Sequence, residues 1–421
     1  MSARAVYVRG VGAVTPLGAS WQASLAALAS GKTAVAQVTE FDVQGFPCTV
    51  AASVPSPLPS CAEYRCPTSI DLDCAPKLQL DRRLALLLPA VLEAWQAANV
   101  SAPATRIGVY LGAESGRAPL QSILALSRAA GGGTTFDHQQ FGQRARALTA
   151  RIDASVVSPA AVASTIAKLF GAEGPVQTLS LACASGLSAV IEGARAIRCG
   201  VVDVAICGGV GADVEPLMLA GFGKLGALSA RGSSCPFDVR RDGFVVGEGA
   251  AAVVLAAARG NARVEVLGGG RSLDAYHLTA PDPQGLGAER AMRAALKEAE
   301  LTHVDYVQAH GTSTPLNDAV EASVLQRIFG ASTEAGMPLV SSVKGAVGHW
   351  IAGAGAIGLL CAVEAIDSGL VLPTAGLQRP DPKCDLPHII GHAQQHNIRA
   401  AMVNALAFGG ANSSLVVGRC R

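Results

Sequence analysis

The chain has 421 residues, of which half are hydrophobic, 15% are charged and 4% are aromatic, and its net charge is +1. This composition argues against a disordered chain and against a strongly basic, nucleic-acid-binding surface. No stretch has the length and apolarity of a membrane span or of a signal peptide. Eleven cysteines in such a chain indicate free thiols, so we expect a cytoplasmic protein.

The first part of the chain alternates between strand and helix patterns. Residues 4–18 predict a strand followed by a turn into a helix, and residues 106–114 and 201–210 predict two more strands. Residues 131–142 are rich in glycine and predict a loop. Residues 80–100 predict a helix with five large apolar side chains turned inward: Leu84, Leu88, Val91, Leu92 and Trp95.

The second part begins near residue 261 and repeats the alternation. Helices are predicted at 287–300, 318–329 and 351–366, and strands at 304–309, 338–343, 401–410 and 413–421. Strands that alternate with helices in both parts predict an α/β fold with largely buried sheets.

Cys183 lies where a strand pattern meets a helix pattern. Residues 176–182 predict a short buried strand, and the helix that follows places Leu187, Val190, Ile191, Ala194 and Ile197 on one face, with Gly200 as its C-terminal cap. The N-terminus of a helix favours a thiolate and can bind an oxyanion. This stretch alone fits a buried structural cysteine equally well.

Two further segments place reactive side chains at the ends of predicted elements. His310 follows a strand and precedes Thr312, Ser313 and Thr314, and Asn317 or Asp318 is predicted to cap the next helix. Lys344 and His349 lie five residues apart before the glycine-rich helix. Loops at strand ends are where α/β enzymes gather catalytic groups, although each residue alone is more typical of an ordinary polar side chain.

Two clusters raise the question of a metal site. The spacings of Cys48, Cys61, Cys66 and Cys74 do not match the paired ligands of structural zinc, and no histidine lies among them. His388, His392 and His396 would align on a helix, but Gly391 interrupts them and favours a loop. We therefore predict no metal.

Six motifs together resemble the β-ketoacyl-acyl-carrier-protein synthases, the elongating condensing enzymes of fatty acid and type II polyketide assembly. "LACASG", "HGTSTPLND" and "KGAVGH" occur in that family's order and separations, and the opening "VRGVGAVTPLG", "PFDVRRDGFVVGEGAA" and the closing "NALAFGGANSSLVV" extend the resemblance over the whole chain. The resemblance implies a thiolase-type fold of two similar α/β halves, 1–260 and 261–421. These halves form a five-layered αβαβα core and usually a dimer.

The resemblance also implies roles for individual residues. Cys183 matches the nucleophile that receives the acyl chain, and His310 and His349 match the pair that promotes decarboxylation of the malonyl extender. Lys344 and Glu321 match residues that organise the site. The remaining matches are Thr312 and Thr314 at the pantetheine arm, Phe408 as the gate whose N–H joins that of Cys183 in the oxyanion hole, and Phe222 beside the acyl channel.

The implied partner is an acyl-carrier protein, which brings its own phosphopantetheine, so no metal or redox cofactor is expected. Family members often have basic residues before the helix at residue 80, but this chain has Asp71 and Asp73 there. We therefore name four basic residues as candidates for docking: Lys77, Arg82, Arg83 and Lys224. This altered stretch favours a specialised polyene or polyketide pathway over housekeeping fatty acid synthesis.

Two other functions have to be weighed. One is a non-catalytic, chain-length-setting partner in a ketosynthase heterodimer, but such partners typically lack the active cysteine that this chain has. The other is a coenzyme A-dependent thiolase, whose second catalytic cysteine has no counterpart that we identify here. The chain itself is expected to form a homodimer, or a heterodimer with a ketosynthase-like subunit.

Overall fold

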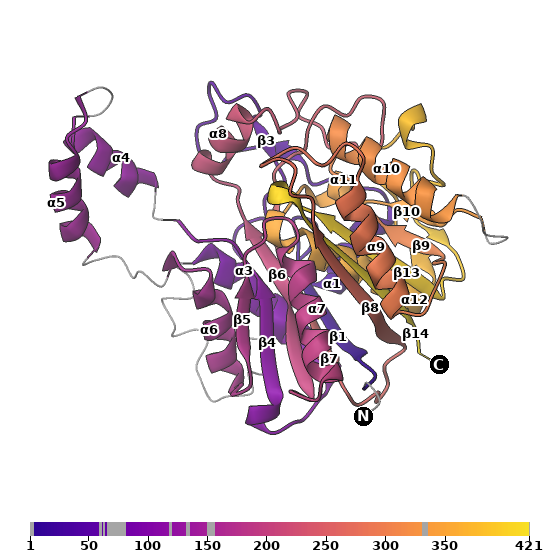
Figure 1. Ribbon diagram of the computed structural model, residues 1–421. Helices are drawn as coiled ribbons and strands as arrows, with labels where there is room; N and C mark the ends of the chain where they lie inside the picture. The colour runs from indigo at the N-terminus through magenta and orange to yellow at the C-terminus, as the bar shows by residue number, and fades with distance from the viewer. Residues whose placement is uncertain are drawn as a thin grey trace.

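A ten-stranded mixed sheet runs through the molecule in the order β10-β9-β13-β14-β8-β1-β7-β6-β4-β5. The computed structural model in Figure 1 describes residues 4–58, 61, 64, 81–117, 120–131, 135–149, 156–330 and 336–420. The strands of the first half are β1 (Tyr7–Val14), β4 (Ile107–Gly112), β5 (Val176–Leu179), β6 (Val204–Ala212) and β7 (Glu248–Ala256). Those of the second half are β8 (Val264–Leu273), β9 (Tyr306–Gln308), β10 (Leu339–Ser341), β13 (Ala400–Leu406) and β14 (Ala411–Arg419).

The two halves repeat one topology. If the five strands of each half are numbered in chain order, both halves have the spatial order 3-2-4-5-1. The halves join where β1 pairs with β8, through Tyr7 with Glu265 and Val8 with Val264. Two short hairpin-like sheets, β2 (Ala36–Gln37) with β3 (Val50–Ala51) and β11 (Leu370–Val371) with β12 (Gln394–Gln395), lie outside the main sheet. The division into units 1–260 and 261–421 stays a prediction.

Helices cover the sheet in three layers. The helices α3 (Arg82–Ala98) and α6 (Ala160–Phe170) pack on the outer face of the first half, and α9 (Leu286–Glu298) packs on that of the second, next to α10 (Pro315–Phe329). The helices α7 (Ser185–Arg198) and α12 (Ala354–Asp367) contact each other and lie between the two halves of the sheet (Figure 1). The arrangement is the αβαβα core that the resemblance implies.

The remaining helices lie outside these layers. They are α1 (Trp21–Ala29), α4 (Leu120–Ala129), α5 (His138–Thr149), α8 (Pro216–Lys224) and α11 (Lys344–Val347). The pair α4 and α5 projects from the body of the molecule (Figure 1). Among the described residues, no helix combines the length and the apolarity that crossing a membrane requires.

The apolar and small residues of the two central helices, α7 and α12, explain why these helices are buried. In α7 the five apolar residues predicted to face inward are all buried, and Gly200 follows the helix with a left-handed φ of 70°. In α12 most side chains are small or apolar, so this helix is buried nearly all round. Such a helix packs between two layers instead of lying on a surface.

The N-terminus of α7 approaches the sheet very closely. A Cβ atom on Gly112, at the end of β4, would lie 2.3 Å from the backbone nitrogen of Gly186. A Cβ on Gly209 of β6 would lie 2.9 Å from the Cα of the same Gly186. Only glycine allows this contact, which fixes where the helix begins.

Three sequence predictions need correction. Residues 138–142 belong to α5 instead of a loop, because the Asp137 carboxylate caps the helix by accepting the N–H groups of Gln139 and Gln140. The strand β5 is an edge strand and its residues are exposed or half-buried, not buried. The strands β7 and β8 were not predicted. Three glycines and two charged residues interrupt β8, whereas β7 is an alanine-rich apolar run that does not by itself distinguish a strand from a helix.

Candidate active site

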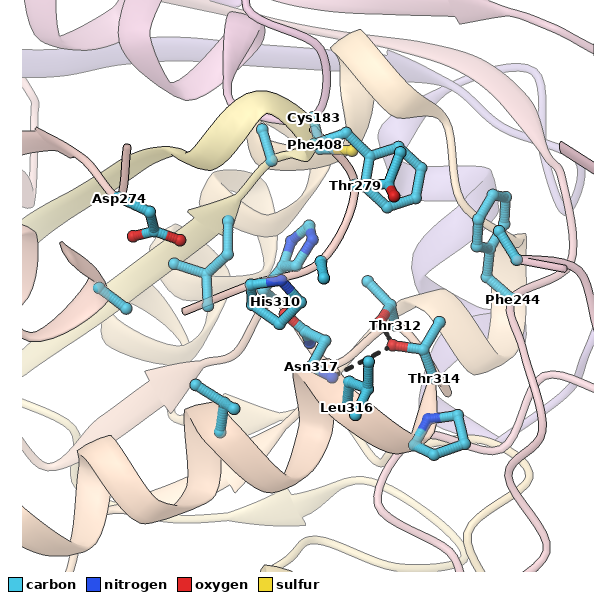
Figure 2. A pocket seen from close by; sticks show the side chains of 18 of the residues that line it. Cys183, Phe244, Asp274, Thr279, His310, Thr312, Thr314, Leu316, Asn317 and Phe408 are labelled. Atoms are coloured by element: carbon cyan, nitrogen blue, oxygen red, sulfur yellow. Dashed lines mark hydrogen bonds between the residues drawn. The ribbon is translucent and has the colours of Figure 1, made fainter. Parts of the chain in front are cut away.

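Three loops from different parts of the chain meet at one cavity. Cys183 lies between β5 and α7, His310 follows β9, and His349 follows α11. One ligand atom of each, a sulfur or an imidazole nitrogen, lies within 4.8 Å of the others, and all three residues are buried. The cavity beside them has a volume of about 380 Å³, and Figure 2 shows Cys183, Phe408 and His310 among its lining.

Burial dominates the chemistry of Cys183. It raises the pKa of the thiol to about 12, although the Lys344 ammonium and the N–H of Phe408 both lower it. The expectation of a thiolate at the helix N-terminus is therefore wrong for the resting protein, which holds a neutral thiol. The N–H groups of Cys183 and Phe408 both point toward the sulfur, so they lie where an oxyanion formed on the attacked carbonyl could accept them.

The hydrogen bonds of the two histidines assign their tautomers. The N–H of Ile351 donates to Nδ1 of His349 over 3.1 Å, so the ring proton is on Nε2. Nδ1 of His310 lies 3.4 Å from the Lys344 ammonium, which donates to it, and again leaves the proton on Nε2. Burial, together with the nearby Lys344 charge, lowers the pKa of both histidines well below the ordinary value. The site thus holds two neutral imidazoles, each with one N–H to donate.

Lys344 sits behind His310. Its ammonium also donates to the backbone carbonyl of His310, and the side chain is buried. Burial lowers the pKa of Lys344 to about 8, and the Glu321 carboxylate opposes this shift. The ammonium therefore orders the histidine loop and supplies positive charge close to the sulfur.

Two buried carboxylates hold the loop that carries His310. Glu321 accepts the N–H groups of His310 and Gly311, each over 2.8 Å. Asp318 accepts those of Thr312 and Ser313 over 2.9 and 3.1 Å. The prediction that Asn317 or Asp318 caps α10 was therefore wrong.

The cap of α10 is Thr314, whose hydroxyl accepts the N–H of Asn317 over 3.4 Å. Asn404 was not predicted as part of the site, but its side-chain amide donates to Glu321 over 3.2 Å. Asn404 opens the motif NALAFGGANSSLVV, but its hydrogen bond to Glu321 is visible only in the fold.

The walls of the cavity differ in character. Thr312 and Thr314 share a hydrogen bond of 2.9 Å on one wall (Figure 2). Phe244 and Phe408 are on its lining as well, and Phe222 packs behind them with ring centroids 5.3 and 6.4 Å away. Hydroxyls along an apolar channel suit an amide-containing chain such as a pantetheine arm.

The predicted docking residues differ in how exposed their side chains are and in whether they are already ion-paired. Arg83 is buried and ion-paired with Asp81 over 2.6 Å, so its assignment to a docking surface is wrong. Arg82 is half-exposed, but Nε and Nη2 both bind the Glu248 carboxylate. Lys224 is exposed at the end of α8 and stays a candidate, and Lys77 lies outside the described residues.

The two clusters considered as metal sites are only partly described. Cys48 is buried with its thiol near the carbonyl of Val50, Cys61 is half-buried, and Cys66 and Cys74 lie outside the described residues. The three histidines occupy irregular chain, as predicted, and His388 stacks against Phe237 with ring centroids 4.9 Å apart.

Comparison with known proteins decides the family. Profiles of the N-terminal and C-terminal domains of beta-ketoacyl synthases match residues 3–260 and 264–378. The chain belongs to the β-ketoacyl synthase family. Cys183 lies in the part matched by the N-terminal profile, and His310 and His349 lie in the part matched by the C-terminal one. The cavity is therefore built from both domains of the synthase family.

Relatives of the synthase span the whole chain. It is 32% identical to 3-oxoacyl-[acyl-carrier-protein] synthase 2 of Coxiella burnetii, over 100% of this chain and 99% of that protein. The ishigamide ketosynthase/chain length factor has a similar structure, with a TM-score of 0.82, 28% identity and full coverage of both chains. A ketosynthase solved in complex with a type II PKS acyl-carrier protein gives a TM-score of 0.81 and 27% identity, over 99% of this chain and all of that one.

Proposed function

We propose that this chain is a catalytic ketosynthase, which accepts an acyl group on Cys183 and joins it to a malonyl unit carried by an acyl-carrier protein. The observation that carries the proposal is the pair of neutral imidazoles with their Nε2–H groups beside the buried thiol. Two fixed N–H donors on buried rings stabilise an enolate strongly. A chain-length-setting partner has no use for this arrangement.

In the first half-reaction the sulfur of Cys183 attacks the thioester carbonyl of the acyl donor. A bond forms between this sulfur and the acyl carbon, the bond from that carbon to the pantetheine sulfur breaks, and the thiol proton ends on the departing pantetheine. The N–H groups of Cys183 and Phe408 bind the oxyanion between these events. An oxyanion-hole donor of this kind is typically worth about 10²–10³ in rate.

In the second half-reaction malonyl-carrier protein loses carbon dioxide. The electrons of the broken C–C bond form an enolate, whose oxygen accepts the Nε2–H groups of His310 and His349. The enolate carbon then attacks the acyl carbonyl, and the sulfur of Cys183 leaves and takes one proton from solvent. Every electron pair and proton is accounted for, so the proposed reaction needs neither a metal nor a redox cofactor.

We propose further that the synthase acts as a dimer, with a second copy or with a ketosynthase-like subunit. The edge strand β5 supports this, because Val176 within it and Leu181 just after it are 40% and 39% exposed in the single chain. A structural relative is a ketosynthase/chain length factor. The carrier protein would dock near the cavity mouth, where Lys224 is a candidate contact.

A reducing, cytoplasmic location is the remaining part of the proposal. Cys183 is a free thiol in the structure and must stay reduced to react. A coenzyme A-dependent thiolase is disfavoured, since Cys183 is the only cysteine among the described residues that lines the cavity.

The test separates the two half-reactions. His349→Ala should still accept an acyl group on Cys183 but should release little carbon dioxide from malonyl-carrier protein. Cys183→Ala should show the converse loss, with no acyl transfer, while the histidine pair is intact. Intact-protein mass and release of labelled carbon dioxide measure the two steps. Full condensation by His349→Ala would contradict the assigned roles.

A further inference from the structure

A carboxylate from the end of β4 lies under the turn that carries the nucleophile. Glu114 follows β4 and reaches the segment between β5 and α7. One of its oxygens, Oε1, accepts the N–H of Ala182 over 2.9 Å. The other, Oε2, accepts the hydroxyl of Ser180 over 2.6 Å. Glu114 therefore binds the residue that immediately precedes Cys183.

The turn needs such support, because Ala182 has an unfavourable conformation. Its φ is +48°, in the left-handed region that residues with a Cβ atom rarely adopt. Ser185 provides part of the support, since its hydroxyl accepts the N–H of Leu181 over 2.8 Å and donates to the carbonyl of Ala182 over 2.6 Å. The N–H of Ala182 is left to Glu114. Strain of this kind persists only where surrounding contacts hold it.

Glu114 is itself fixed from behind. Its backbone carbonyl accepts Nη1 of Arg83 over 2.7 Å. Arg83 is buried and is held by Asp81 through an ion pair of 2.6 Å. The support for the turn thus extends from a buried ion pair, through the backbone of Glu114, to its carboxylate.

We propose that Glu114 is a positioning residue for Cys183, which holds the Ala182 turn so that the sulfur faces the two histidines and the Cys183 N–H stays in the oxyanion hole. The inference rests on the proposed function for its kinetic consequence. Its geometric consequence, the reactivity of the thiol, can be measured without any acyl donor.

Two substitutions separate the reach of the side chain from its charge. Glu114→Asp keeps the charge but is one methylene too short to bind both Ala182 and Ser180. Glu114→Gln keeps the length and an oxygen for the Ala182 N–H, while the Ser180 hydroxyl can turn to accept from its amide. The matched control is Glu192→Gln, since Glu192 lies on α7 itself and pairs with Arg195 and Arg271 instead of the turn.

The measurements are kcat and KM for condensation and the rate of Cys183 alkylation by iodoacetamide against pH. For Glu114→Asp we expect kcat to fall about tenfold, with KM within about twofold of the wild type. For Glu114→Gln we expect kcat within about threefold of the wild type. Because the Glu114 carboxylate raises the pKa of Cys183, the alkylation profile of Glu114→Gln should move to lower pH, and that of Glu114→Asp should not.

Two results would overturn the proposal. One is a Glu114→Asp variant with wild-type kcat and alkylation rate. The other is a Glu114→Gln variant that loses as much kcat as Glu114→Asp and keeps the wild-type pH profile, since a general loss of stability would do that. If the wild type condenses with no carrier protein at all, the proposed function fails, whereas the alkylation profiles still decide the role of Glu114.

Discussion

Cys183 owes its reactivity to a balance between burial and nearby positive groups. Because burial raises its pKa to about 12, the thiolate fraction between pH 7 and 10 should increase about tenfold with each pH unit. We therefore predict that alkylation of Cys183 by iodoacetamide accelerates by about that factor per unit, without a plateau in this range. Peptide mass spectrometry measures the rate. A plateau near pH 8 would contradict the account.

Lys344 is the strongest of the groups that favour the thiolate. The variant Lys344→Met removes that charge and should lower the alkylation rate of Cys183 at pH 7, because the thiol pKa rises further. Lys297→Met is a suitable control, since Lys297 lies in the exposed last turn of α9. An unchanged rate in Lys344→Met would mean that the ammonium does not act on the sulfur.

The two neutral imidazoles also affect stability. The pKa of both His310 and His349 is lowered in the folded chain, so below the ordinary value near pH 6.5 the unfolded chain binds more protons. The free energy of unfolding should therefore fall as the pH drops below about 6.5, by up to about 1.4 kcal/mol per pH unit for each histidine. In the double variant His310→Asn/His349→Asn, urea unfolding should show a smaller loss of the free energy of unfolding as the pH falls below 6.5. Part of the loss should remain, because burial also lowers the pKa of His388. A loss per pH unit as large as that of the wild type would contradict the neutral pair.

At this scale the family resemblance predicted which residues meet at the cavity but not how they are held. Cys183, His310 and His349 stand at element ends, but the resemblance, and not their spacing, implied that they lie together. The tautomers depend on which backbone N–H faces each ring, and Glu114 depends on where the end of β4 lies relative to β5. Neither is a property of local sequence.

The element that matters most is α7, because it begins directly after the turn that carries Cys183 and its first turn touches the sheet. Gly112→Ala would place a Cβ 2.3 Å from the backbone of Gly186, so the start of the helix must move. We predict a loss of about 1–3 kcal/mol in the free energy of unfolding and a lower alkylation rate of Cys183. Urea unfolding and peptide mass spectrometry measure the two effects.

The control for that substitution is Gly142→Ala on α5, where an added Cβ meets nothing within 4 Å. A helix interior favours alanine over glycine by about 1 kcal/mol, so this variant should be as stable as the wild type or more stable. If Gly112→Ala were as stable as Gly142→Ala, the close contact between α7 and the sheet would be contradicted.

Most helices could be predicted because their apolar residues recur at helical spacing, as in α3 and α7. The strands β7 and β8 could not, since glycines and charged residues interrupt β8 and the alanine-rich run of β7 fits a helix as well as a strand. The exposure of β5 was also missed. Its position at the edge follows from the order of all ten strands. The sequence of one strand does not determine which strands pair with it.

At the scale of the molecule, the sheet ends at β5, and no other strand of the described residues pairs with its outer edge. We predict that the purified chain forms a homodimer through this edge, and that Val176→Lys weakens it by placing a charge there. Val201→Lys is the control, since Val201 is 49% exposed and lies after α7 instead of in β5. Light scattering with size-exclusion chromatography distinguishes dimer from monomer. A wild-type monomer would contradict the homodimer, and an unaffected Val176→Lys dimer would contradict this edge.

The repeated strand order of the two halves explains why the site lies between them. Each half contributes loops from the same region of its topology, with Cys183 from the first and His310 and His349 from the second. The resemblance implied this duplication, whereas periodicity in the sequence did not show it, because similar folds do not require similar residues.

The most direct test of the central claim is the intact mass of the protein after mixing with a panel of acyl-carrier proteins and then malonyl-carrier protein. We predict that one acyl group appears on Cys183, that malonyl-carrier protein removes it, and that a β-ketoacyl-carrier protein is formed. An acyl-free protein with every donor, or an acyl group that persists after malonyl-carrier protein is added, would contradict the proposal that this chain is a catalytic ketosynthase.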